Sequence, residues 1–282
     1  MNLRVVGSAV FIVFLGISAT FLAEAQIMYS LKVDIGKNIN QTAKESGAPR
    51  FRIESYWGLE FYEIVDMPLN VAVKFSRPGF EISIKPLFSL TMSADSENKN
   101  DMAVEQISLL FSRHAAKSHE DAQAFISDIL KQFSRGKWKR HIDENCPAVT
   151  GRSTYLDHAG NINGTCPLDP AYQPSREDWI QLMKQANSYE WLGDGVIAKL
   201  TISYTEDSRG LTYNIELEFE DFSIRNRRNA KMLSKELAQG DEKGRKSTEK
   251  YRKEIKENKI KVNNLEANAL QRGDQVITRS QY

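Results

Sequence analysis

The strongest constraint on the fold is a pair of segments, residues 196–204 and 211–219, in which apolar and polar residues alternate. Successive residues of a β-strand point to opposite faces, so this alternation predicts strands with one buried and one solvated face. A short polar loop separates the two segments, which is typical of an antiparallel hairpin. A one-residue slip would expose the whole apolar set, so the pattern also predicts the register. Glu216 and Glu218 then lie on the outer face.

More strands are expected earlier in the chain. Residues 51–65, 69–75 and 104–112 are rich in β-branched and aromatic residues, which favour strands. Between them, 80–94 also reads as strand but is interrupted by Pro86, which cannot donate to a ladder and indicates an edge or a bulge.

Two amphipathic helices are predicted, each opened by a serine with an aspartate three residues later. The first begins at Ser118 and stops near Gly136, and the second begins at Ser175. The apolar stripes are Ala122, Phe125, Ile126, Ile129, Leu130 and Phe133 in the first, and Trp179, Leu182, Met183 and Ala186 in the second. The expected fold class is therefore α+β, an antiparallel sheet packed by two amphipathic helices.

The N-terminal residues 1–25 have the pattern of a signal peptide. A short basic start precedes an apolar run over 5–22, and Ala-Glu-Ala follows at 23–25. The apolar run is also nearly long enough to span a bilayer as an uncleaved anchor. Cleavage is favoured because the small-residue site lies where the run stops. We therefore expect a periplasmic or secreted protein, or alternatively one anchored in the inner membrane and facing the periplasm.

The two cysteines, Cys146 and Cys166, are predicted to form a disulfide in such an oxidising compartment. Zinc ligation is the alternative, but neither cysteine belongs to a Cys-x-x-Cys pair. No metal site is expected, and the segment 141–170 reads as a loop closed by the disulfide.

The remaining organisation follows from composition. A polar stretch with glycine and proline makes 26–50 a predicted linker. The globular α+β domain is expected at 51–224, and a duplicated ββα-like unit in the halves 51–142 and 171–224 is an alternative organisation of it. A charged helical tail is expected at 225–282.

That tail contains sixteen Lys/Arg and eight Asp/Glu, a net charge of +8, against −7 for the rest of the chain. Nucleic acid is not the expected partner, because the tail has only one internal aromatic residue, Tyr251, for base stacking. Ile255, Val262 and Ala269 recur every seven residues and suggest a weak coiled-coil seam. A solvated helix is favoured, although self-association through the tail is an alternative.

Catalytic signatures are absent from the sequence. It contains no Gly-x-Ser-x-Gly, His-Glu-x-x-His, P-loop or dinucleotide fingerprint. The nearest candidates are His141, Asp157 and His158, which would serve an envelope hydrolase or secreted effector with its site at 141–170. Hydrogen bonding within the loop explains these residues more simply. An enzyme is therefore disfavoured, and no cofactor is expected.

Binding is suggested instead by two clusters of aromatic residues with acidic groups and glycine. They contain Tyr56 with Trp57, and Tyr189 with Trp191. Such rings dominate protein interfaces, although core packing is the alternative for each. The expected function is that of an exported non-catalytic binding protein, an inhibitor or immunity-type protein whose partner is a secreted enzyme or toxin. A membrane-anchored envelope scaffold is a further alternative, and membrane contact is expected only with an uncleaved leader.

Overall fold

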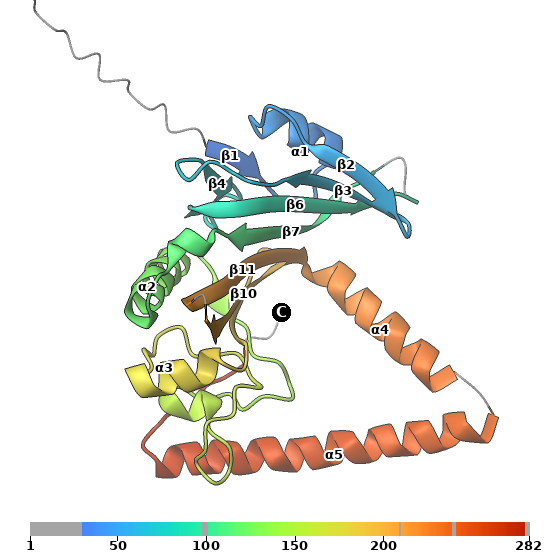
Figure 1. Ribbon diagram of the computed structural model, residues 1–282. Helices are drawn as coiled ribbons and strands as arrows, with labels where there is room; N and C mark the ends of the chain where they lie inside the picture. Colours follow the sequence, from blue (N-terminus) through green and yellow to red (C-terminus); the bar gives the residue numbers. More distant parts are fainter. Residues whose placement is uncertain (1–29, 98–100, 209, 239–240, 280–282) are drawn as a thin grey trace, which may run out of the picture.

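The computed structural model describes residues 30–97, 101–208, 210–238 and 241–279 of the chain. Over these residues the fold is α+β, as predicted (Figure 1). The expected leader at 1–25 lies outside the described residues. Among the helices that are described, none is both long enough and apolar enough to cross a membrane.

One antiparallel sheet dominates the described chain, with the strand order β2-β3-β6-β7-β11-β10-β9-β8. These strands are β2 (Arg52–Tyr56), β3 (Leu59–Ile64), β6 (Leu87–Asp95), β7 (Val104–Phe111), β8 (Lys139–Arg140), β9 (Asn187–Gly193), β10 (Val196–Asp207) and β11 (Gly210–Asp221). The predicted hairpin is confirmed as β10–β11, with Leu200 opposite Leu217 and both side chains buried. Both halves of the expected domain contribute strands to this sheet, so its core is continuous.

The two predicted helices are confirmed as α2 (His119–Arg135) and α3 (Arg176–Met183). The side chains of Ser118 and Ser175 cap them by accepting hydrogen bonds from the backbone N–H three residues on, at 3.0 and 3.1 Å. The expected stripe of α2 faces the core, where Phe133 is fully buried. Helix α3 ends before Ala186, which has a φ of 60° and reverses the chain into β9.

The structure corrects the linker expected at 26–50. Strand β1 (Ser30–Val33) pairs in parallel with β4 (Ala72–Phe75), and β5 (Ile82–Ile84) completes a three-stranded sheet. Helix α1 (Ile39–Glu45) follows β1 and is capped by the Asn38 side chain. Val33 and Ile39 are buried in the common core. Strand β1 and helix α1 were missed because each is too short for a clear periodicity, and β1 is stabilised by a strand about forty residues away.

The tail forms two helices, α4 (Phe222–Ala238) and α5 (Asp241–Gln271). Helix α4 leads away from the end of β11, and α5 runs back to the region of the disulfide loop (Figure 1). The residues of the seven-residue pattern differ in burial along α5. Val262 and Ala269 are buried, whereas Ile255 is 47% exposed. The expectation of a solvated helix therefore holds near Ile255, while the C-terminal half of α5 packs against its own chain.

Candidate functional site

The β2–β3 hairpin forms one edge of the main sheet and turns through Trp57 and Gly58. The φ angles of these two residues are 55° and 77°. Two positive angles are what a two-residue type I′ turn requires. Glycine adopts this conformation freely, but for a residue with a Cβ atom it costs about 1–2 kcal/mol. The sequence therefore accepts local strain in order to hold a tryptophan at the tip.

The side chains at this tip form an exposed aromatic group. Trp57 is 93% exposed and Tyr56 is 45% exposed. The Tyr56 ring stacks on Phe61 with centroids 4.4 Å apart, and meets the edge of Trp57 at 5.4 Å. The platform beneath the indole is thus ordered, while the indole itself faces solvent. Tryptophan and tyrosine in such positions are typical anchors of protein interfaces.

Charged side chains flank the aromatic tip along the hairpin. Arg52 on β2 forms an ion pair with Glu63 on β3, and its guanidinium lies 3.6 Å from Glu54. The hydrogen bond to Glu63 raises the pKa of Arg52. An aromatic centre with a polar surround has the composition of a protein interface.

The second predicted aromatic pair has a different location. Tyr189 and Trp191 are 1% and 3% exposed on the core face of β9. Trp191 stacks on Phe133 of α2 with centroids 3.8 Å apart. Burial raises the pKa of Tyr189. Both residues therefore belong to the core and are too buried to contact a partner, which corrects the prediction that they bind one.

The residues proposed for catalysis do not converge. His141 is half-buried against the edge of Phe222, with ring centroids 5.8 Å apart, and burial lowers its pKa. Asp157 accepts hydrogen bonds from the backbone N–H groups of Ala159 and Asn161, at 2.8 and 2.9 Å. That is the hydrogen-bonded loop favoured above. Asp157 and His158 line a hollow of about 440 Å³ beside α5 whose walls do not include His141.

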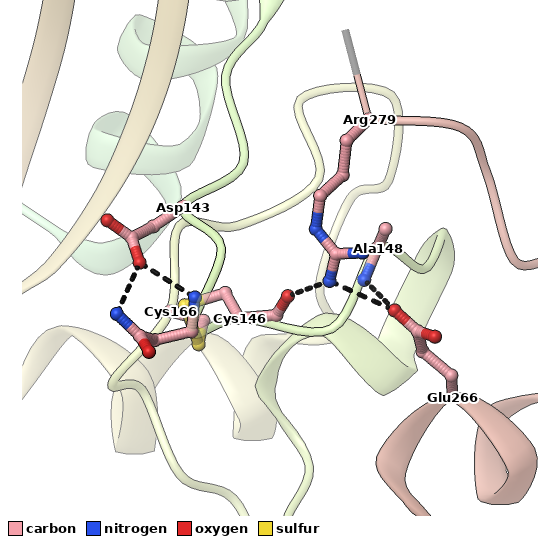
Figure 2. The surroundings of a disulfide bond; sticks show 7 residues. Asp143, Cys146, Ala148, Cys166, Glu266 and Arg279 are labelled. Atoms are coloured by element: carbon pink, nitrogen blue, oxygen red, sulfur yellow. Dashed lines mark hydrogen bonds and ion pairs between the residues drawn. A yellow bond between two sulfur atoms is a disulfide. The ribbon is translucent and has the colours of Figure 1, made fainter. Parts of the chain in front are cut away.

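The predicted disulfide between Cys146 and Cys166 is present. Figure 2 shows that the C-terminal segment meets the loop next to it: Arg279 donates to the Cys146 carbonyl at 2.6 Å and to Glu266 of α5 at 3.1 Å. Glu266 also accepts from the backbone N–H of Ala148 at 2.9 Å. The disulfide loop, α5 and the chain end therefore support one another. Across the described residues, no group of three His, Cys, Asp or Glu side chains is placed to hold a metal ion.

An apolar pocket lies at the start of β6, and the periodicity of the sequence does not predict it. It has a volume of about 680 Å³, and its lining includes Leu69, Phe88 and Leu110. Phe88 is 42% and Leu110 is 36% exposed. These residues come from a loop and two strands, so only the pairing of β6 with β7 brings them together.

A buried carboxylate was also missed by sequence reasoning, which used Asp178 only as a helix-opening residue. Both its oxygens accept hydrogen bonds from Arg152, at 2.7 and 2.9 Å, and one accepts from the Tyr155 hydroxyl at 2.8 Å. The Arg152 hydrogen bonds hold the pKa of Asp178 below its ordinary value of 3.8. This cluster ties α3 to the disulfide loop.

Substituting Asp178→Asn should lower the free energy of unfolding at pH 7 by about 1–2 kcal/mol. A carboxyl group with a lowered folded-state pKa contributes its full stability above its ordinary pKa of 3.8 and loses it as the pH falls through the folded-state value. Urea denaturation from pH 7 to pH 3 should therefore show that the difference in unfolding free energy between the original chain and the variant becomes smaller below about pH 4. Asp128→Asn, at an exposed carboxylate paired with Lys131, is the control and should change little. A deficit that is constant with pH would contradict the assignment.

Comparison with known proteins adds no evidence about the function of this chain. No protein family, characterised protein or solved structure matches the chain. The candidate site therefore depends on the hairpin itself.

Proposed function

We propose that this chain is an exported, non-catalytic binding protein that contacts a partner protein through the tip of the β2–β3 hairpin. The observation that carries the proposal is Trp57, which is 93% exposed in a left-handed backbone conformation. Solvation alone does not favour such a position, since Gly or Asn would fit the turn with less strain. A large ring that is already fixed in its binding conformation loses little conformational entropy when the partner binds.

The positions of the candidate catalytic side chains favour binding over catalysis. His141 packs against Phe222, whereas Asp157 and His158 line a separate hollow. A general base has to lie within hydrogen-bonding reach of the group it deprotonates and be oriented there. The carboxylate of Asp157 is instead engaged by the backbone of its own loop.

Export is supported by the leader pattern at 1–25 and is compatible with the disulfide between Cys146 and Cys166. The periplasm or the exterior is the proposed location. The partner we favour is a secreted enzyme or toxin, which would make this an inhibitor or immunity-type protein. The charged residues beside the tip, Arg52, Glu54 and Glu63, would form the rim of that contact.

The test is capture of partners from a periplasmic extract, with the full chain and its Trp57→Ala variant compared side by side. We expect one stoichiometric enzyme, inhibited by the full chain, and at least a tenfold loss of affinity in the variant, since anchor tryptophans contribute about 2 kcal/mol or more. Ile260→Ala, at an exposed apolar residue of α5, is the matched control and should bind normally. Turnover by the purified chain alone, abolished by His158→Ala or His141→Ala, would instead establish the hydrolase alternative.

A further inference from the structure

The two edges of the main sheet differ in how they are protected. At one end β8 is only two residues long, and Arg140 donates to the Val149 carbonyl of the disulfide loop at 2.7 Å. At the other end all five residues of β2 are exposed. No described strand pairs with its outer side. A bare edge without proline or a bulge can pair with another strand.

The register of the hairpin shows which backbone groups of β2 point away from β3. The two-residue turn makes Tyr56 and Leu59 a hydrogen-bonded pair. In an antiparallel ladder hydrogen-bonded pairs recur at every second residue, so Glu54 and Arg52 also bond to β3. The N–H and C=O groups of Ile53 and Ser55 therefore point outward from the sheet.

We propose that β2 pairs in antiparallel fashion with β2 of a second copy of this chain, about a two-fold axis at Ile53. Outward-pointing residues have to face each other, which restricts the registers to steps of two residues. Centring on Ile53 places Arg52 of each copy beside Glu54 of the other. Two opposite-charge pairs form, and such cross-strand pairs stabilise a sheet.

Each of the two neighbouring symmetric registers places one pair of like charges directly opposite each other. A step of two residues in one direction sets Glu54 against Glu54 of the second copy. The opposite step sets Arg52 against Arg52, with Glu54 of each copy beside Arg50 of the other. Like charges directly opposite each other destabilise a strand pair. Of these three symmetric registers, only the one centred on Ile53 places no like charges directly opposite each other.

The two faces of this pairing are also complementary. Ile53, which is 53% exposed, would contact Ile53 of the second copy on the face that carries Tyr62. On the other face Arg50 of one copy would lie beside the exposed ring of Tyr56 of the second, a cation–π arrangement.

Trp57 lies beyond the paired segment at each end. The indole of each copy stays open to a partner, whereas Tyr56, Arg52 and Glu54 take part in the dimer contact. This inference does not depend on the proposed function.

The first test is the mass of the full chain in solution, by sedimentation equilibrium over a range of concentrations. A dimer is expected, and Ser55→Pro should raise its dissociation constant at least about tenfold. Proline at this position removes an outward N–H and leaves the bonds to β3 in place. Ile53→Lys should act similarly, while Ile260→Lys, the same change at an exposed site on α5, should not. A chain that stays monomeric, or association that persists in Ser55→Pro, overturns the proposal.

A charge exchange tests the register itself. The Glu54→Arg variant alone and the Arg52→Glu/Glu63→Arg variant alone should each be monomeric, because like charges meet across the axis. The Glu63→Arg change preserves the ion pair within the hairpin. An equimolar mixture of the two variants should form a heterodimer, since opposite charges then meet at all four positions. Recovery in the mixture also shows that both variants are folded, and failure to recover rejects this register.

Discussion

Replacing Trp191 by alanine should lower the free energy of unfolding by about 3–5 kcal/mol. The indole is 3% exposed, stacks on Phe133 at 3.8 Å and lies near Tyr189. Its removal leaves a large cavity between β9 and α2 that the closely packed surroundings fill only in part. Urea denaturation followed by circular dichroism gives the value directly.

Trp57→Ala is the natural comparison, because it deletes the same side chain at the hairpin tip. With 93% exposure there is little packing to lose, and the change in unfolding free energy should stay within about 0.5 kcal/mol. The two variants thus separate a structural tryptophan from a proposed binding one. A loss below about 1 kcal/mol for Trp191→Ala would contradict the core assignment.

Removing the disulfide by Cys146→Ser/Cys166→Ser should lower the free energy of unfolding by about 3 kcal/mol, as expected when a loop of this length is opened. The effect should extend to the tail. Arg279 and Glu266 bind backbone groups of Cys146 and Ala148, so a loosened loop releases the segment that follows α5. Denaturation measures the first effect, and the rate of limited proteolysis at 272–279 measures the second.

Arg279→Ala separates the two contributions. It removes the hydrogen bonds of the guanidinium to the Cys146 carbonyl and to Glu266, while the disulfide is retained. Faster cleavage at 272–279 is expected with only a modest loss of overall stability, about 1–2 kcal/mol. If cleavage stays slow in the disulfide variant, the chain end is held independently of the loop.

Elements with local signals were predictable from the sequence. The alternation over 196–219 led to β10–β11 and their register, and the capped helices at Ser118 and Ser175 begin where expected. Each signal concerns residues close together in the chain. Strand β1 was missed because it gains its stability from β4, a strand remote in sequence.

The candidate site was only half predictable. The two aromatic clusters look alike as sequence, yet Trp57 lies at a turn on the sheet edge and Trp191 on the core face of β9, against Phe133 of α2. Exposure depends on which elements cover a residue, and that is not a local property. The position of β2 at the edge of the sheet formed by the described strands likewise emerges only from the order of those strands.

Local sequence signals were enough to predict the fold class, the two capped helices, the β10–β11 hairpin and the pairing of Cys146 with Cys166, because periodicity, capping and loop closure act over short stretches of chain. The packing of the folded chain was needed to show which aromatic rings face solvent, which described strand lies at the edge of the sheet, and how α5 contacts the disulfide loop. These features are set by contacts between segments far apart in the chain.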